Sequence, residues 1–249
     1  MHRFYLPPEL CQGSLLTLAN GEAHHALHVL RLRQGENVEV LDGKGHIFHA
    51  EVKNLGKRTV DLLVKKHEFK PPLPFQVTLV QAIPKGKAFE NIVQKATELG
   101  AARIIPVLTE RVVVHLGDGS VETKLEKWRQ VAIEAIKQCG SPYLPEFEPP
   151  ITLPNLLQRE PRFDLSLVGD LTETMAHPRK YFQEFAQAHD SAFPKFVAAW
   201  VGPEGDFTIK ELELIRASGA KPITLGPLVL RSDTAAIYLL SVINYELSA

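Results

Sequence analysis

The 249-residue sequence has few cysteines, little net charge and no long apolar run, and each shortage excludes a class of protein. Its two cysteines, Cys11 and Cys139, fit neither a disulfide framework nor a zinc pattern, so we expect thiols in a reducing compartment. No stretch approaches the roughly 20 apolar residues of a membrane span, and the N-terminus lacks the apolar segment of a signal peptide. We therefore expect a cytoplasmic protein with no membrane partner.

Familiar catalytic motifs are also missing. The sequence contains no Gly-x-Ser-x-Gly elbow and no Walker lysine motif, which disfavours a nucleotide-dependent oxidoreductase or hydrolase. Residues 43–45 begin like a dinucleotide fingerprint, but Phe48 stands where the third glycine belongs. His24 and His28 are one helical turn apart without an evident third ligand, so we expect no metal.

Charge gives only a local indication of a nucleic-acid partner. The net charge is −1, and residues 1–70 carry 10 Lys+Arg against 8 Asp+Glu. An RNA-binding surface would therefore be a small patch, for which Arg3, Arg31, Arg33 and the cluster 65–67 are the candidates. The alternative for each of these side chains is an ordinary solvated surface.

Residues 71–74, Pro-Pro-Leu-Pro, form the clearest boundary, because prolines stiffen the backbone and remove its donors. Before it, alternating apolar runs at 36–41, 47–52 and 59–64 are bounded by glycine turns. This pattern predicts a small β-rich domain over residues 1–70, a barrel, with a helical turn or two around 22–30.

After the linker, strand-like runs alternate with helix-period segments, which predicts an α/β domain over residues 75–249. Gly100 and Gly219 stand where helices end, while Thr208 and Glu211 form a capping-box pattern with Phe207 and Leu212 as its hydrophobic staple. The expected strands are 76–82, 103–108, 164–168, 196–201 and 222–225, and the expected helices are 87–99, 122–138, 178–188, 209–217 and 233–247.

Two loops after predicted strands are candidates for a ligand site. Residues 201–208 contain Gly202, Pro203 and Gly205, and residues 225–234 form an apolar loop that ends at the last helix. Ligands of open α/β sheets lie beyond the carboxyl ends of strands, so the loops together predict an apolar slot for a flat base with a polar tail. Ser232 is the expected N-cap of the last helix. The alternative is a pair of structural turns.

Taken with the order of other segments, these loops resemble those of the RsmE family, bacterial methyltransferases that act on uridine N3 in small-subunit ribosomal RNA. The resemblance covers nearly the whole chain and includes His2-Arg3-Phe4, residues 42–45, residues 94–100 and both loops. Three departures stand out: Asp206 where the family has glycine, Ser232-Asp233 where it has threonine-glutamate, and a changed segment at 138–142.

The resemblance implies a PUA-like β-barrel followed by a SPOUT-type α/β domain with a C-terminal trefoil knot, assembled as a homodimer. It implies that S-adenosylmethionine binds in the knot loops, lined by Val201, Gly202, Pro203, Gly205, Leu225, Gly226, Leu228 and Leu230.

The expected reaction is methylation of uridine N3 in 16S ribosomal RNA of the small ribosomal subunit. We interpret Arg231 as a cation near the base or phosphate, and Glu204 as a group that orients substrate or accepts the proton. A carboxylate that merely ties down its own loop is the alternative for Glu204. The alternative functions are another SPOUT RNA methyltransferase, acting on a ribose 2′-hydroxyl or another base, and a non-catalytic RNA-binding or ribosome-assembly factor.

Overall fold

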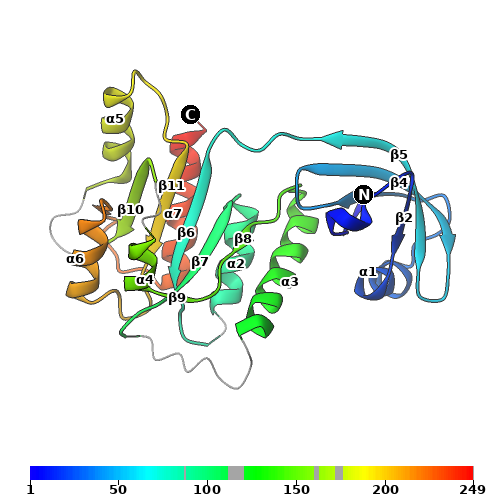
Figure 1. Ribbon diagram of the computed structural model, residues 1–249, viewed down its shortest axis with the longest axis horizontal. Coiled ribbons are helices and arrows are strands. Elements are labelled where there is room, and N and C mark those ends of the chain that lie inside the picture. Colours follow the sequence, from blue (N-terminus) through cyan, green and yellow to red (C-terminus); the bar gives the residue numbers. More distant parts are fainter. Residues whose placement is uncertain (87, 112–120, 160–162, 172–175, 249) are drawn as a thin grey trace. The chain divides into compact units, whose positions relative to one another are not determined.

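The computed structural model describes residues 1–86, 88–111, 121–159, 163–171 and 176–248 (Figure 1). It divides into an N-terminal unit, residues 1–72 with 133–144, and a C-terminal unit, residues 73–132 with 145–249. Residues 133–144, which the sequence pattern assigns to the second domain, group with the N-terminal unit because Ile133, Ile136 and Leu144 pack around Tyr5. The domain boundaries 1–70 and 75–249 stay a prediction.

The N-terminal unit is built on a five-stranded sheet in the order β1-β3-β4-β5-β2. All neighbouring strands are antiparallel except β1 and β3, and apolar side chains from one face form a buried cluster around Phe4. The strands are β1 (His2–Tyr5), β2 (Leu15–Leu18), β3 (Asn37–Leu41), β4 (His46–Leu55) and β5 (Val60–Phe69). The helical turns are η1 (Pro8–Leu10), α1 (Asn20–His24) and the π-helical η2 (His25–Val29).

This unit confirms the predicted β-rich N-terminal part and the helical turns around 22–30. The turn at 42–45 forms because the Asp42 carboxylate accepts hydrogen bonds from the Lys44 and His46 amides, at 2.7 and 3.0 Å. The prediction missed β1 and β2 and ended β4 and β5 too early.

The C-terminal unit contains a parallel sheet in the order β12-β10-β11-β6-β7-β8, with β9 also paired to β7. Its strands are β6 (Gln76–Ala82), β7 (Arg103–Leu108), β8 (Glu146–Phe147), β9 (Ile151–Thr152), β10 (Leu165–Gly169), β11 (Phe196–Val201) and β12 (Lys221–Ile223). The helices are α2 (Ala88–Glu98), α3 (Val121–Cys139), α4 (Leu153–Gln158), α5 (Pro178–Ala188), α6 (Ile209–Ala217) and α7 (Ser232–Leu247).

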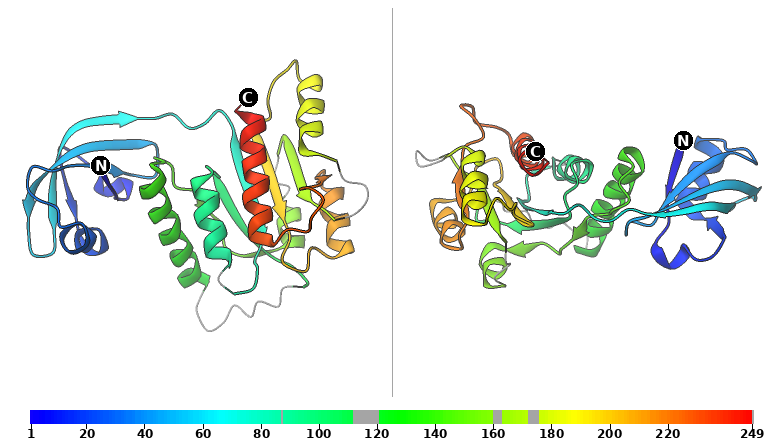
Figure 2. Two further views of the ribbon diagram at one scale, coloured as in Figure 1. Left: turned by 180° about the vertical axis from the view of Figure 1, so that it is seen from behind. Right: turned by 90° about the horizontal axis from the view of Figure 1, so that it is seen from above.

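Helices cover both faces of this sheet, as expected for parallel strands that are buried on either side (Figure 2). On one face, α4 and α6 share a core cluster with alternate residues of β6, β7 and β11, including Val80, Ile105 and Trp200. On the other, α7 contacts β6 and β11 and packs against α2.

The alternation of strands and helices that the sequence predicts is confirmed, with β6, β7, β11, α5 and α6 at the predicted residues. Lys87, the first residue of a predicted helix, lies outside the described residues. The prediction missed three short elements: β8, β9 and α4. Among the helices that the structure describes, none combines the length and apolar character needed to cross a bilayer.

Candidate functional site

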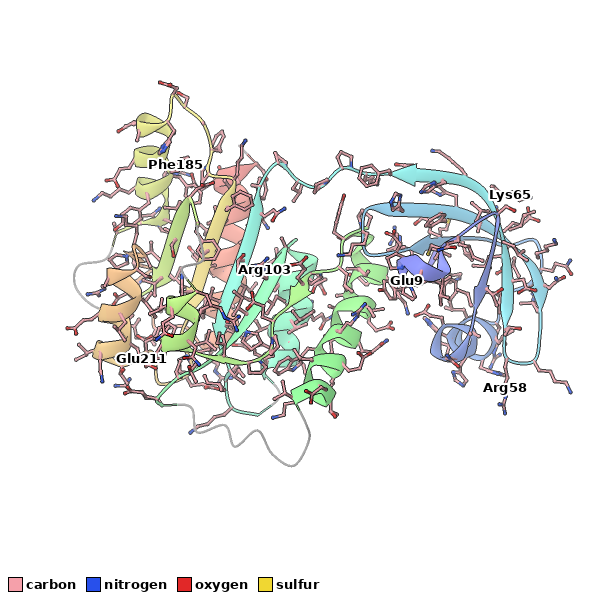
Figure 3. The ribbon with its side chains drawn as sticks, in the orientation of Figure 1. Glu9, Arg58, Lys65, Arg103, Phe185 and Glu211 are labelled. Carbon is pink, nitrogen blue, oxygen red and sulfur yellow. The ribbon has the colours of Figure 1, made fainter. Side chains whose placement is uncertain are left out.

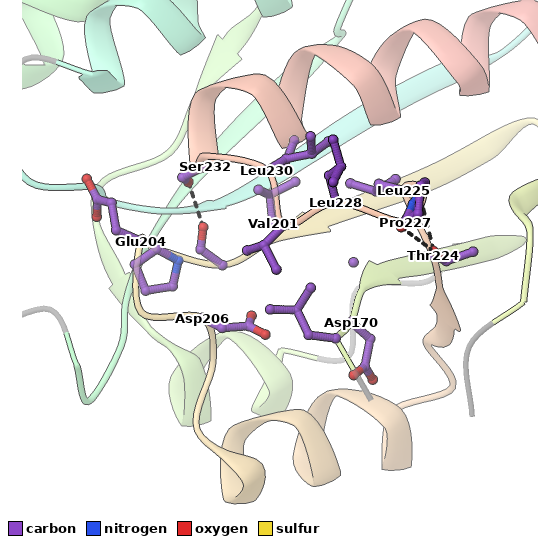
Figure 4. Close-up of a pocket in the computed structure, with 17 residues that line it drawn as sticks. Asp170, Val201, Glu204, Asp206, Thr224, Leu225, Pro227, Leu228, Leu230 and Ser232 are labelled. Carbon is purple, nitrogen blue, oxygen red and sulfur yellow. Dashed lines mark hydrogen bonds between the residues drawn. The ribbon is translucent and has the colours of Figure 1, made fainter. Parts of the chain in front are cut away.

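Loops that follow three neighbouring strands border a single pocket with a cavity of about 250 Å³ (Figure 4). The strands are β10, β11 and β12, and their carboxyl ends share one edge of the sheet because they run parallel. We call residues 202–208 the first loop and residues 224–231 the second loop. The lining consists of Gly169, Asp170, Leu171, Val201, Gly202, Pro203, Glu204, Asp206, Thr224, Leu225, Gly226, Pro227, Leu228, Val229, Leu230, Ser232 and Ala235.

A buried chain of hydrogen bonds fixes the start of the first loop. The Ser232 hydroxyl donates to the Gly202 carbonyl at 2.6 Å and accepts from Gln81 Nε2 at 2.9 Å. Gln81, fully buried on β6, also donates to the Val201 carbonyl at 3.4 Å. The prediction of Ser232 as an N-cap is wrong: Arg231 occupies that position and makes no side-chain cap. Ser232 is the first residue of α7, and its hydroxyl binds the first loop rather than a free amide of the helix.

The middle of the first loop is tied to neighbouring loops. Both carboxylate oxygens of Glu204 accept from the Lys85 amide, at 3.1 and 3.3 Å, which joins the loop to the segment after β6. The Arg111 guanidinium donates to the Gly205 carbonyl. Glu204 is exposed, and its carboxylate is bonded to the backbone of Lys85. These contacts favour a role in positioning the first loop.

The end of the first loop is fixed by a buried carboxylate, Glu211, on the first turn of α6 (Figure 3). One oxygen accepts from the Thr208 amide at 2.8 Å while Thr208 Oγ1 accepts from the Glu211 amide, which confirms the predicted capping box. The other oxygen accepts from the Glu110 amide at 2.9 Å. Phe207 and Leu212, the predicted staple, lie in the same buried cluster.

Asp206 has a left-handed backbone, with φ of +59°, a conformation in which glycine is the usual residue. Its Oδ1 accepts from the Phe207 amide at 2.8 Å. A Cβ atom at position 202 would lie 2.7 Å from this oxygen and 3.2 Å from the Phe207 backbone nitrogen, which favours glycine at position 202. Burial, reinforced by the nearby charge of Asp170, raises the pKa of the Asp206 carboxyl above its ordinary value, although the Phe207 amide opposes the shift.

Asp170 brings a second carboxylate to the lining from the loop after β10. Its side chain is fully buried and pairs with Arg216 of α6, whose Nε lies 3.1 Å from Oδ2. Sequence reasoning missed this residue because the loop has no glycine-proline motif. The signal was an aspartate directly after an apolar strand, at the edge where the other two loops also lie.

The second loop has few internal bonds. Thr224 Oγ1 accepts from the Gly226 amide at 3.1 Å and donates to its carbonyl at 3.2 Å. Beyond it, Leu228 and Val229 line the pocket yet remain 75% and 77% exposed. Within the described part of the chain, no hydrogen bond satisfies the backbone of Leu228, Val229 or Leu230. Apolar side chains and free backbone groups therefore stand together at the pocket's rim.

The structure brings most of the predicted site residues together. Glu204 and seven of the predicted cofactor residues line the pocket, namely Val201, Gly202, Pro203, Leu225, Gly226, Leu228 and Leu230. Gly205 and Arg231 do not line it, although their chain neighbours do. Their roles stay predictions, as do those of the lining residues.

The predicted RNA contacts lie in the N-terminal unit. Arg3 Nε pairs with Glu39 Oε2 at 2.8 Å, and its Nη1 donates to the Lys137 and Gln138 carbonyls at 3.3 and 3.2 Å. Arg31 and Arg33 are exposed, and neither guanidinium has a partner within the residues that the structure covers. Lys65 of β5 (Figure 3) pairs with Glu51 at 3.1 Å. Across the same residues, no cluster of three or more His, Cys, Asp or Glu side chains could hold a metal ion.

Comparisons with known proteins agree with this architecture. Residues 71–244 match the RNA methyltransferase domain family, and residues 18–65 match the RNA methyltransferase PUA domain family. The predicted fold class, a PUA-like sheet followed by an α/β methyltransferase domain, is therefore confirmed. The ribosomal RNA small subunit methyltransferase E of Synechocystis is 32% identical over 98% of this chain and 77% of its own. The Aquifex aeolicus protein of the same name is 31% identical over 98% and 99%.

Solved structures agree over the same length. A Legionella pneumophila structure in complex with bound SAM superposes with a TM-score of 0.87 at 34% identity, covering 98% of this chain and 96% of that one. The ribosomal RNA small subunit methyltransferase E of Neisseria gonorrhoeae, bound to S-adenosyl methionine, gives 0.84 at 28% identity, covering 98% and 97%. With two family models, near-complete coverage and a shared fold, the chain belongs to the ribosomal RNA small subunit methyltransferase E family.

Proposed function

We propose that this protein uses S-adenosylmethionine to methylate N3 of a uridine in 16S ribosomal RNA of the small ribosomal subunit. The observation that carries the proposal is the convergence of the first and second loops on one pocket beyond β10, β11 and β12. Ligands of parallel α/β sheets bind at this edge, where backbone groups are free to meet them. Membership of the methyltransferase E family supports the choice of reaction.

The residues present fit an adenosine-linked ligand. Leu228 and Val229 expose apolar surface to water at the rim of the pocket, and a flat base placed against them would bury that surface. The unbonded backbone groups of the second loop suit the donors and acceptors on the edge of such a base. The carboxylate of Asp206 gives the lining a negative character that suits a cationic ligand, whereas the charge of Asp170 is balanced by Arg216.

In this proposal the cofactor supplies an already activated methyl group, and the protein's own residues orient the reactants and exclude water. Glu204 holds the first loop through the Lys85 amide. Arg231 is exposed between two lining residues, and its guanidinium has no partner in the described ranges. It carries a positive charge toward the RNA, where it stabilises charge that develops on the uridine oxygens.

Further parts of the proposal rest on the family resemblance. Arg31 and Arg33 contact RNA phosphates, whereas the internal bonds of Arg3 give it a role in holding the end of α3. The C-terminal chain forms a trefoil knot, two copies assemble as a homodimer, and the protein works in the cytoplasm on ribosomal RNA.

The test is to incubate small ribosomal subunits that lack the modification with the protein and a labelled methyl donor, and to identify the product nucleoside by mass. We expect 3-methyluridine. A 2′-O-methylated ribose or another methylated base would contradict the substrate assignment. Cofactor binding without any transfer would instead indicate a binding factor that lacks catalysis.

Two variants separate the proposed roles. Glu204→Gln keeps an acceptor for the Lys85 amide, so a positioning role predicts a near-normal rate, whereas a proton acceptor would lose most of its activity. Arg231→Ala is expected to reduce transfer about 100-fold without loss of stability. Glu213→Gln, an exposed carboxylate on α6 outside the lining, is the control. A normal rate for Arg231→Ala would remove the arginine from the mechanism.

A further inference from the structure

Asp206 gives the pocket a negative charge that forms no direct ion pair with the described side chains, although the Arg111 cation acts on it from nearby. Of the lining aspartates, Asp170 pairs with Arg216, whereas Asp206 forms no ion pair with any residue that the structure describes. Among the described residues, the Asp206 side chain forms one hydrogen bond, in which Oδ1 accepts from the neighbouring Phe207 amide. Its second carboxylate oxygen is free to face the cavity (Figure 4).

Position 206 is also a costly place for this side chain. A left-handed backbone suits glycine best, although aspartate and asparagine adopt it more readily than most residues, and partial burial disfavours the charged form of a carboxyl. Glycine would avoid both penalties. Local strain at a ligand pocket is typical of a functional position, which together with its place in the lining points to a role for the carboxylate.

We propose that Asp206 makes the pocket selective for charge, favouring S-adenosylmethionine over the product S-adenosylhomocysteine. This inference rests on the proposed function. Methyl transfer converts a cationic sulfonium into a neutral thioether, so substrate and product differ by one positive charge and one methyl group. A carboxylate within the same cavity attracts the cationic sulfonium. After transfer the ligand's thioether is neutral, so this attraction is lost. Asp206 therefore strengthens substrate binding relative to product binding and favours product release.

Isothermal titration of the full-length protein with S-adenosylmethionine and with S-adenosylhomocysteine tests the proposal. Asp206→Asn removes the charge but keeps an oxygen for the Phe207 amide, and asparagine tolerates the left-handed backbone. We expect the affinity for S-adenosylmethionine, relative to that for S-adenosylhomocysteine, to fall about tenfold in this variant. Asp190→Asn is the matched control, because Asp190 is exposed, has φ of +52° and lies outside the pocket lining.

The outcomes separate this proposal from the proposed function. If the wild-type protein binds neither molecule, the proposed cofactor is wrong. If it binds both and Asp206→Asn leaves their ratio unchanged, the charge-selective role is overturned while the function stands. Asp206→Gly, which suits the backbone at least as well, repeats the measurement and guards against a folding defect of the first variant. A tenfold shift in both variants, absent from Asp190→Asn, supports the proposal.

Discussion

The first and second loops border the same pocket but are held in different ways. The first loop is bonded at its start by Ser232, in its middle by Lys85 and Arg111, and at its end by Glu211. The second loop has hydrogen bonds at its two ends, around Thr224 and Gly226 and at the Arg231 carbonyl, but none at the backbone of residues 228–230 within the described parts of the chain, and its tip leaves apolar side chains exposed. We infer that the first loop is preformed, whereas the second gains its remaining contacts when a ligand binds.

Gln81→Glu is expected to have the largest effect on the preformed loop. Its amide nitrogen donates to Ser232 and to the Val201 and Ala82 carbonyls, and the residue is fully buried. A carboxylate there would face two carbonyl oxygens without solvent, so we expect the free energy of unfolding to fall by about 3 kcal/mol or more. Urea denaturation measures it. Gln76→Glu, an exposed position on the same strand, should change little. Equal losses in both variants would contradict the importance of the buried bonds.

Ser232→Ala should have the next largest effect. The change leaves the Gly202 carbonyl without its donor and the Gln81 amide without one of its acceptors, so we expect the free energy of unfolding to fall by about 1–3 kcal/mol. Hydrogen exchange of the first loop should accelerate. Ser241→Ala is the matched control, because that hydroxyl bonds the Ile237 carbonyl of its own helix at an exposed position. Unchanged exchange in the first loop would show that this hydroxyl does not hold it.

Leu228→Ser separates the second loop from the first. Because the side chain is 75% exposed, we expect the unfolding free energy to change by less than about 0.5 kcal/mol. Affinity for S-adenosylmethionine should fall about tenfold, since the ligand would lose apolar contact. Ile209→Ser, equally exposed but outside the pocket lining, provides the comparison. A large loss of stability without loss of affinity would reverse the contrast between the loops.

Asp206→Asn is expected to have a small effect on stability, one that is opposite in sign to the first two variants and depends on pH. Burial and the charge of Asp170 raise the pKa of the folded carboxyl against the opposing effects of the Phe207 amide and Arg111, so ionisation destabilises the folded state. Above the folded pKa the variant should therefore be more stable than the wild type, by roughly 0.3 kcal/mol, because solvent screens this partly exposed carboxyl. The gain should shrink as pH falls through the folded pKa and vanish below the ordinary value of 3.8. Thermal unfolding between pH 3 and pH 8 measures it, and a gain that grows in acid would contradict the assignment.

Local patterns were sufficient for much of the fold. The long apolar runs of β6, β7 and β11 and the capping box at Thr208 lie where the sequence predicts them, because their signals are contained within a few residues. The short elements β1, β8 and β9 were missed because two to four residues are too few for a period. They become strands only by pairing with neighbours that are distant in the sequence.

The sequence by itself determined the two glycine-containing loops, the position of Asp206 and the family resemblance. Tertiary structure decided what their side chains do. Ser232 reads locally as a helix cap, yet its hydroxyl binds Gly202, and Asp170 pairs with Arg216 on another element. Hydrogen bonds and ion pairs between residues far apart in the chain depend on how the sheet brings its strand ends together, and no local pattern carries that information.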